Sequence, residues 1–373
     1  MTNREKLISY IKHGGDKFLC SPQIGAGAGF DSRLAGKTWI SDTTFEDTRK
    51  ACELFDIVPL YNFGLPDLTK LTDSVRYEET KTLDESKRVT TTRLITPKGE
   101  LVSHAVEQER KGGLTTKYFI TDEAELPIFE YYLDCLLEVK DFSLITDEVK
   151  EVRKAVGEEN ALDIQWPMQP YELMCFPSTL DTAIFAKEDP ETCIRLMDKI
   201  LTLNESLIKA VALGGADFVF LGGPGSEIIS PQYYEDFLVP YSKLVSQIVH
   251  ENGLLIYSHI CSLIEPMLTK GYYNQMGIDL FETLSEAPVG NVKSLADAFS
   301  KLDPEICTRG NIGLDKLLLS EPEEIYRISL EILKTAKQMD RKHILAASDY
   351  MFYDIPEKNV QAMVNAVNEF NAQ

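Results

Sequence analysis

A histidine and a cysteine stand two residues apart at the end of an apolar run, in the segment LLIYSHIC. If this run is a β-strand, the alternation of side chains sends His259 and Cys261 to the same face. An imidazole and a thiolate are ligands that a borderline-soft ion such as zinc favours. The same tripeptide also arises by chance, and a buried cysteine is usually a small hydrophobic residue, so the pair needs further ligands.

Two acidic residues close later apolar runs and can complete such a site. Glu282 ends the run IDLFET, and Asp349 ends the run HILAASD. Either carboxylate can supply an oxygen ligand or act as a general acid, whereas the alternative for both is capping of the following helix. We take His259, Glu282 and Asp349 as candidate catalytic residues, and His259, Cys261 and Asp349 as candidate metal ligands.

Glycines and aromatic residues near other strand ends are candidates for substrate binding. A Gly-Gly-Pro-Gly loop can offer backbone amides to an anionic group, but it lacks the lysine and hydroxyl residue of a P-loop, which disfavours a nucleotide site. Aromatic side chains can form the wall of a flat cleft, although they belong to the core more often. The candidate substrate-binding residues are Trp166, Tyr171, Tyr257, Gly222, Gly223 and Asn311.

The elements that must position these residues are short apolar runs, most of them followed by a longer amphipathic stretch. This alternation is typical of a parallel α/β fold. The closure number of a (β/α)8 barrel is eight strands, so the sequence predicts a TIM barrel with its active site at the C-terminal ends of the strands. The eight runs are KFLCSP (17–22), DIVPLYNF (56–63), ALDIQWP (161–167), ADFVFLGG (216–223), LLIYSHIC (254–261), IDLFET (278–283), ICTRGN (306–311) and HILAASD (343–349).

Residues 75–108 interrupt this pattern with alternating, threonine-rich segments around a turn at Pro97 and Gly99. Such alternation predicts an antiparallel β-meander inserted into the barrel. Apolar residues at helical spacing predict helices over 190–212 and 231–251. Because no low-complexity tract or long linker divides the chain, we expect residues 1–373 to form one domain.

The composition argues against several classes of protein. Acidic residues number 59 against 38 basic ones, and the net charge of -21 would repel a nucleic-acid backbone. Seven scattered cysteines do not form the pattern of a disulfide-rich secreted domain. Neither a signal-peptide core nor an apolar run of about 18 residues is present. We therefore expect a cytoplasmic protein that binds neither nucleic acid nor membrane.

The succession of segments resembles the uroporphyrinogen decarboxylase superfamily, and the TPKGEL turn resembles its corrinoid-linked methyltransferases. The resemblance implies the same TIM barrel along most of the chain. Decarboxylases of the family grip a tetrapyrrole polycarboxylate with an arginine-rich N-terminal motif, whereas the corresponding stretch LCSPQIGAGAGFDSR contains only Arg33. The segments that carry the resemblance are ADFVFLGGPGSEIISPQYYEDFLVPY, GLLIYSHIC, GIDLFETL, TRGNI and ILAASDYMFYDIPEKNV.

The resemblance also implies a metal and a reaction. In the related coenzyme M methyltransferases, zinc is held by a His-x-Cys pair, which His259 and Cys261 match, and by a later cysteine, which Asp349 replaces here. Oxygen in place of sulfur makes the site harder, which suits an oxygen-containing substrate. The implied enzyme moves a methyl group from a small methoxylated compound to a corrinoid protein, with zinc assistance. The corrinoid is expected on a separate partner, because the chain lacks an Asp-x-His-x-x-Gly cobalamin signature.

Three alternatives remain open at this level. The same residues could transfer a methyl group from a methyl-corrinoid to a thiol, whose pKa the metal would have to lower. A decarboxylase without metal would use Asp349 or Glu282 as an acid and would remain active after chelation. A binding protein with the same barrel would show ligand affinity without turnover.

Overall fold

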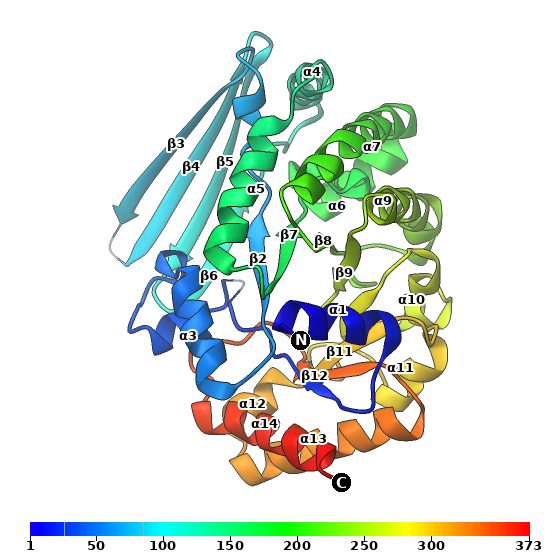
Figure 1. The fold of residues 1–373 in the computed structure, drawn as a ribbon. Coiled ribbons are helices and arrows are strands. Elements are labelled where there is room, and N and C mark those ends of the chain that lie inside the picture. The colour runs from blue at the N-terminus through cyan, green and yellow to red at the C-terminus, as the bar shows by residue number, and fades with distance from the viewer. Residues whose placement is uncertain (26, 85) are drawn as a thin grey trace.

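The structure is a computed structural model that describes residues 1–25, 27–84 and 86–373 (Figure 1). In these ranges eight parallel strands form one curled sheet, in the order β1-β12-β11-β10-β9-β8-β7-β2. Every predicted apolar run overlaps one of them, and only β2 and β11 extend one residue beyond their runs, which confirms the α/β barrel class. The strands are β1 (Leu19–Cys20), β2 (Leu60–Gly64), β7 (Ala161–Gln165), β8 (Phe218–Leu221), β9 (Leu255–His259), β10 (Leu280–Thr283), β11 (Cys307–Ile312) and β12 (His343–Ala347).

The two edge strands of this sheet, β1 and β2, meet at a seam. Among the described residues, single hydrogen bonds take the place of a strand ladder there. The Val58 amide donates to the Cys20 carbonyl over 3.1 Å, and the Ser21 hydroxyl donates to the Val58 carbonyl over 2.7 Å. The barrel is therefore closed more weakly at this seam than between its other strands.

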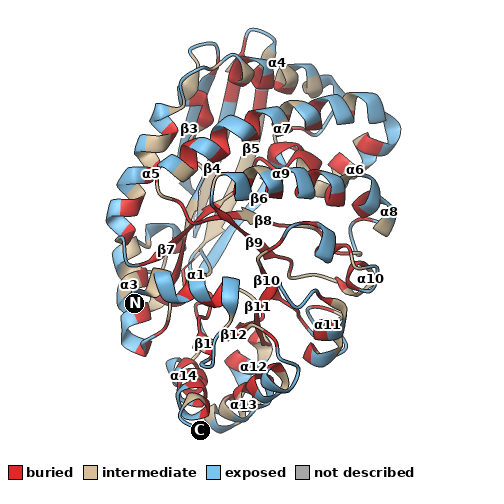
Figure 2. Ribbon diagram, turned by 45° about the vertical axis from the view of Figure 1, so that its right-hand side comes forward, coloured by how far each residue is buried: buried red, intermediate tan, exposed pale blue. Residues whose placement is uncertain are grey.

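Helices surround the sheet and turn their buried faces toward it (Figure 2). The predicted helix over 190–212 is α7, and the one over 231–251 is divided into α8, a π-helical turn at Tyr234–Leu238 and α9. The helices are α1 (Asn3–His13), α2 (Phe30–Leu34), α3 (Phe45–Phe55), α4 (Leu126–Leu137), α5 (Ser143–Val156), α6 (Thr179–Glu188), α7 (Pro190–Leu213), α8 (Pro231–Tyr233), α9 (Val239–Glu251), α10 (Glu265–Thr269), α11 (Leu295–Lys301), α12 (Leu314–Leu319), α13 (Pro322–Gln338) and α14 (Glu357–Asn371).

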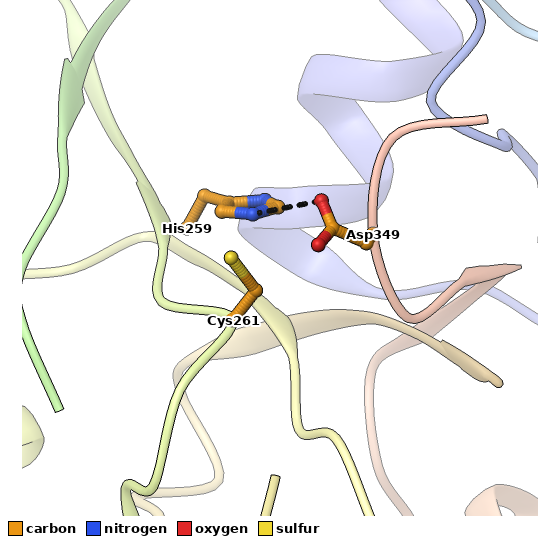
Figure 3. Close-up of side chains that lie close together, drawn as sticks. All are labelled: His259, Cys261 and Asp349. Carbon is orange, nitrogen blue, oxygen red and sulfur yellow. Dashed lines mark ion pairs between the residues drawn. The ribbon is translucent and has the colours of Figure 1, made fainter. Parts of the chain in front are cut away.

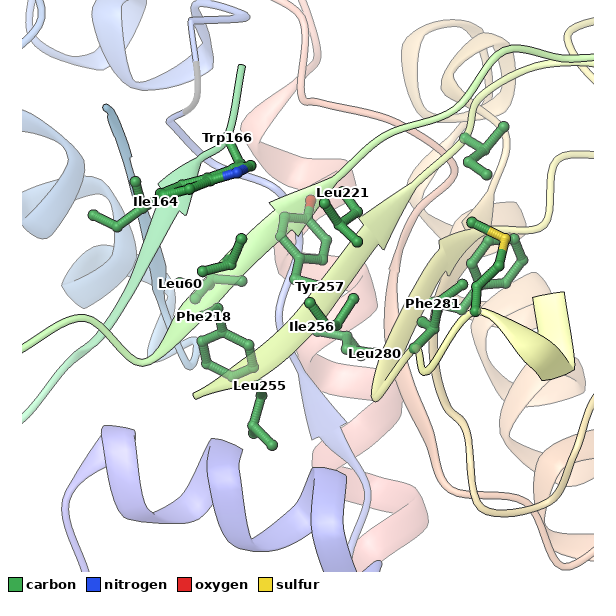
Figure 4. Packing of buried hydrophobic residues seen from close by; sticks show 14 of the residues in the cluster. Leu60, Ile164, Trp166, Phe218, Leu221, Leu255, Ile256, Tyr257, Leu280 and Phe281 are labelled. Carbon is green, nitrogen blue, oxygen red and sulfur yellow. The ribbon is translucent and has the colours of Figure 1, made fainter. Parts of the chain in front are cut away.

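The core lies within the sheet and between the sheet and these helices. Apolar side chains of neighbouring strands form one continuous cluster, which Figure 4 shows for β2 and β7 to β10. Parallel strands buried on both faces require such nearly continuous apolar runs. No helix in the described ranges is long and apolar enough to cross a membrane.

Helix α1 lies across the N-terminal ends of the strands. The Arg4 guanidinium donates to Asp217, the residue before β8, over 2.8 Å. The Tyr10 hydroxyl donates over 2.9 Å to the carbonyl of His343, the first residue of β12. Because α1 covers this end of the barrel, the opposite end is left for a site.

The inserted sheet is larger than the sequence pattern indicated. Its strands are β3 (Arg76–Asp84), β4 (Lys87–Thr96), β5 (Gly99–Gln108) and β6 (Lys111–Lys117), antiparallel in this order. The predicted range of 75–108 therefore omitted β6, whose sequence KGGLTTK has adjacent glycines and little apolar alternation. Position 85 of that range lies outside the described residues. The turn predicted at Pro97 and Gly99 is confirmed, since it joins β4 to β5.

A buried ion pair joins α5 to the N-terminal end of the barrel. Arg153 donates to the Asp217 carboxylate over 2.7 Å and to the carbonyls of Gly215 and Asn160, and its side chain is only 5% exposed. Removal of one partner from a buried pair leaves the other charge uncompensated. The pair should therefore contribute strongly to the stability of the fold.

We predict that Arg153→Ala lowers the free energy of unfolding by about 3 kcal/mol, at the lower end for a broken buried pair, because Arg4 still contacts Asp217. Urea unfolding measures the difference. Lys154→Ala is the matched control, since its exposed pair with Glu151 on the same helix should contribute less than about 0.5 kcal/mol. Equal effects of the two variants would contradict this account.

Candidate active site and metal centre

The three predicted metal ligands lie together at the C-terminal end of the barrel (Figure 3). His259 is the last residue of β9, Cys261 follows two residues later, and Asp349 follows β12. Their ligand atoms all lie within 4.8 Å of one another, and His259 Nε2 is 3.3 Å from Asp349 Oδ1. Two ligands about 2.0 Å from a tetrahedral ion are about 3.3 Å apart, which the distance between His259 and Asp349 matches, and nitrogen, sulfur and oxygen are the donor types that zinc binds.

The second ring nitrogen of His259 and one face of its ring also contact neighbouring residues. His259 Nδ1 is 2.7 Å from Glu282 Oε1, and the Tyr350 ring stacks on the imidazole with centroids 4.6 Å apart. A carboxylate on the second nitrogen fixes the tautomer and the orientation of a metal-binding histidine. His259 is thereby aimed with Nε2 toward Asp349.

Strand register explains why Glu282 reaches His259. Glu282 of β10 is paired with His259 of β9 on one side and with Arg309 of β11 on the other. Its second oxygen accepts from the Arg309 guanidinium and, over 2.8 Å, from the Gln23 amide. The Tyr257 hydroxyl donates to its first oxygen. Glu282 is therefore a fully buried carboxylate with four hydrogen-bonding partners.

Charge decides the protonation state of Glu282. Burial alone would raise its pKa, but the Arg309 guanidinium and His259 outweigh burial and lower the pKa to about 2. Glu282 is ionised at neutral pH, which favours orientation of His259 over donation of a proton. The catalytic role predicted for Glu282 remains a prediction, and this charge state favours a role in positioning His259.

The imidazole of His259 has excess negative charge around it. Burial would lower its pKa, yet hydrogen bonds with Asp349, Cys261 and Glu282 raise the pKa well above its ordinary value. A bound divalent cation would neutralise the same carboxylates. The negative charge around His259 therefore favours a positively charged group at this cluster.

Two adjoining clefts open beside this cluster, and they share Gly27 and Tyr350 in their walls. The larger has a volume of about 580 Å³ and lies against β2 and the start of α3. The smaller, of about 410 Å³, includes Asp349. The polar side chains of the larger cleft are those of Asp31, Ser41, Thr43, Thr44, Thr48, Tyr61, Asn62, Gln165 and Tyr350.

Of the predicted substrate-binding residues, Tyr257 lies beside Glu282 and Arg309 inside the barrel. Tyr171 instead donates to the Gly222 carbonyl over 3.1 Å, in a buried network of protein groups. The described walls of the two mouth clefts do not include Trp166, Tyr171, Gly222, Gly223 or Asn311.

Asn311 lines a different hollow, of about 370 Å³, together with Ser348. Its side-chain amide donates to the Leu284 carbonyl over 3.1 Å. Trp166 is 1% exposed, and its indole nitrogen has no recorded partner in the described residues. The structure thus brings the metal and catalytic candidates together but leaves these substrate candidates apart from them.

Sequence reasoning missed Arg309, Gln23, Tyr350 and Asp163. Arg309 and Asp163 stand inside the apolar runs ICTRGN and ALDIQWP, and a charged residue within a buried strand requires a partner or a shifted pKa. That signal was present in the sequence. Gln23 and Tyr350 lie in loops, where no pattern of spacing indicated them.

Asp163 on β7 is a second buried acid, and its pKa is shifted in the direction opposite to that of Glu282. It is fully buried, and one oxygen accepts from Asn62 over 3.0 Å and from Gln165 over 2.5 Å. Its other oxygen has no recorded partner. Burial raises its pKa to about 8, although these hydrogen bonds oppose the shift. Asp163 is therefore mostly protonated at neutral pH, next to two residues that line the larger cleft.

The fold and this site define a class of α/β-barrel enzymes with a cluster of polar residues at the barrel mouth. Residues 140–370, more than half of the chain, match the family model "Uroporphyrinogen decarboxylase (URO-D)". The chain belongs to the uroporphyrinogen decarboxylase family, which confirms the resemblance in the sequence.

Curated relatives are similar over part of their length. The uroporphyrinogen decarboxylase of Geobacter metallireducens is 22% identical over 266 residues, which are 66% of this chain and 73% of the relative. That of Coxiella burnetii is 23% identical, over 61% of this chain and 63% of the relative. That of Trichodesmium erythraeum is 31% identical, over 49% of each chain.

A solved structure is similar along the whole chain. The methyltransferase from Methanosarcina mazei superposes with a TM-score of 0.68 and 16% identity, over 99% of both chains. At this identity the likeness establishes the fold, which here includes the inserted sheet as well as the barrel.

The buried acid Asp163 should make stability depend on pH. Its raised pKa means that the folded state keeps a proton which the unfolded state loses above about pH 4. The contribution of Asp163 to the free energy of unfolding is thus fully present below about pH 4. It is lost by up to about 1.4 kcal/mol per pH unit between about pH 4 and about pH 8. Asp163→Asn is neutral throughout, so its unfolding free energy relative to wild type should rise between these limits. Urea unfolding across this range checks this, and parallel curves would contradict it.

Metal content tests the cluster directly. Protein purified without a metal-affinity tag should contain about one zinc per chain by elemental mass spectrometry, and His259→Ala should lose it. His250→Ala is the matched control, because His250 also pairs with a carboxylate, Asp279 over 2.8 Å, but lies at the surface of α9. Wild type without metal would refute the site.

Proposed function

We propose that the protein is a methyltransferase that moves a methyl group from a small methoxylated compound to a corrinoid on a partner protein, with zinc held at the barrel mouth. The observation that carries the proposal is the cluster of His259, Cys261 and Asp349, in which Glu282 orients the histidine. Membership of the family and the fold shared with a methyltransferase support it.

The donor set favours an oxygen-containing substrate. Three protein ligands are the usual number for a catalytic zinc site, since the fourth position is left for substrate. Asp349 in place of a second thiolate makes the ion harder and better suited to an ether oxygen than to sulfur. When bound, zinc would act as a Lewis acid toward the oxygen that departs from the methyl group.

The residues of the chain supply orientation and charge. Arg309 keeps Glu282 ionised, and Glu282 holds His259 with Nε2 toward the open end of the barrel. Tyr350 covers one face of the imidazole and also lines both clefts. The ligands are thus held in place before substrate arrives, which lowers the cost of reorganisation during the reaction.

The partner must approach the same end of the barrel. Helix α1 covers the N-terminal ends of the strands, whereas the two clefts open beside Asp349 and Tyr350. A corrinoid protein docked over this end would meet the methyl donor there. Transfer in the opposite direction, to a thiol, would use the same residues, and it differs in requiring zinc to lower the pKa of the thiol.

A second candidate function is decarboxylation without metal. It is favoured by Asp163, a protonated carboxylic acid beside the larger cleft, and by the names of the curated relatives. A tetrapyrrole polycarboxylate is disfavoured as substrate, because Arg33 is engaged by the carbonyls of Tyr353 and Ile355 over 2.6 and 2.8 Å. Chelation separates the two functions, since it should abolish only the metal-dependent one.

The proposal predicts that Glu282→Gln lowers both zinc affinity and the rate of methyl transfer by about 10- to 100-fold, because His259 loses its orienting carboxylate. The assay combines a reduced corrinoid protein with a panel of methoxylated compounds and measures the demethylated product. Glu251→Gln at the exposed end of α9 is the control and should leave both quantities unchanged. Full methyl transfer by His259→Ala or after chelation would refute the role of the metal.

A further inference from the structure

We propose that the turn between β5 and β6 forms an anion-binding site at the barrel mouth, and that the methyl donor is therefore a small carboxylate or a compound of similar charge. The site is inferred from two cations, Arg110 in this turn and Lys111 at the start of β6. Its assignment to the methyl donor rests on the proposed function, whereas its affinity for an anion does not.

Arg110 and Lys111 line the smaller mouth cleft together with Asp349. A cleft of about 410 Å³ has room for a small molecule. The lining of this single cleft thus includes both a proposed zinc ligand and two cations from the inserted sheet. The other lining residues are Gly27, Ala28, Gly112, Leu318, Tyr350, Phe352 and Asp354.

The turn is held against the barrel by contacts of its own. The Arg110 amide donates to the Thr38 carbonyl over 2.6 Å, and the Arg110 guanidinium lies 5.6 Å from the centre of the Tyr353 ring. Arg110 has φ of 63°, a left-handed conformation that non-glycine residues adopt where their surroundings impose it. A Cβ added to Gly112 would lie 3.3 Å from the Gly27 carbonyl oxygen. The cations are therefore positioned by the fold.

The charges of the cleft favour an anion. In the described part of the chain, no ion pair is recorded for Arg110 or Lys111, whereas Arg88 at the same end of the inserted sheet pairs with Asp42 over 2.6 Å. Of the two acids in the wall, Asp349 already faces His259, whose Nε2 is 3.3 Å from Asp349 Oδ1. Two cations then face one remaining acid, Asp354.

A carboxylate suits these donors. Arginine binds a carboxylate through two parallel hydrogen bonds, and lysine adds a point charge. Arg33, which stands in the stretch where decarboxylases carry substrate-binding arginines, is occupied by backbone carbonyls and by Glu357. The inserted sheet thus supplies cations that the N-terminal stretch does not offer. A methoxylated carboxylate could place its ether at the zinc ligands and its anionic end at the turn.

The test measures binding, so that it does not depend on methyl transfer. Zinc-loaded full-length protein is titrated calorimetrically with 4-methoxybenzoate and with the neutral 4-methoxybenzamide at low ionic strength, where exposed charges are least screened. The variants are Arg110→Gln and Lys111→Gln. The matched control is Lys98→Gln, in the turn between β4 and β5 at the other end of the sheet. Arg110→Gln keeps an unbranched side chain at the same φ.

We expect wild type to bind the carboxylate at least tenfold more tightly than the amide. Each turn variant should weaken carboxylate binding about tenfold and amide binding less than twofold, and Lys98→Gln should change neither. Equal affinity for the two compounds, no measurable binding of the carboxylate, or equal losses for both compounds in the turn variants would overturn the site. If Arg110→Gln weakened only the docking of a corrinoid protein, Arg110 would be a protein contact, and this result would also overturn the anion site.

The two proposals fail in different ways. Carboxylate selectivity that depends on Arg110, in a protein that transfers no methyl group, would support the anion site and refute the proposed function. Transfer from methoxylated carboxylates and from neutral methoxylated compounds alike, unchanged in Arg110→Gln, would support the function and refute the anion site.

Discussion

The site depends on one buried ionic contact, between Glu282 and Arg309 on adjacent strands of the barrel. Burial of two charges is costly, and it is tolerated where the remaining hydrogen-bonding capacity is also satisfied. Gln23 and Tyr257 meet that requirement for Glu282. With its charge maintained, the carboxylate can hold His259, and His259 in turn faces Asp349. Without Arg309, burial would drive Glu282 toward its neutral form and the orientation of the histidine would be lost.

The barrel interior holds two buried acids in opposite protonation states. Glu282 has a guanidinium in contact and a pKa of about 2, whereas Asp163 has amide donors and a pKa of about 8. Both side chains are fully buried, so the difference comes from the adjacent cation. The barrel thereby offers an ionised carboxylate beside the proposed metal ligands and a protonated acid beside the larger cleft. This pairing explains why a methyl-transfer chemistry and a decarboxylation chemistry can both be considered for one scaffold.

The inserted sheet and the barrel contribute different parts of the mouth. The barrel supplies rigid strand ends, which carry His259 and Glu282 with little freedom. The inserted sheet packs against α4 through β4 and β5, in which Leu94 and Leu101 are buried, and its β5–β6 turn reaches the cleft beside Asp349. Residues on the barrel strands and residues on the inserted sheet can therefore be substituted independently of one another. Specificity in barrel enzymes commonly resides in such loops and insertions.

The sequence alone determined the eight strands, the antiparallel insertion and the proximity of His259 to Cys261. These features follow from local periodicity, which sets the faces of each strand and places strand ends at one edge of the barrel. Only the tertiary structure decided which side chains meet across the barrel. Register brought Arg309 to Glu282, and docking of the insertion brought Arg110 to Asp349's cleft. Tyr171 and Gly222, which we predicted to bind substrate, form a hydrogen bond with each other. The sequence did not indicate this, because contacts between distant segments depend on register and packing that local patterns do not encode.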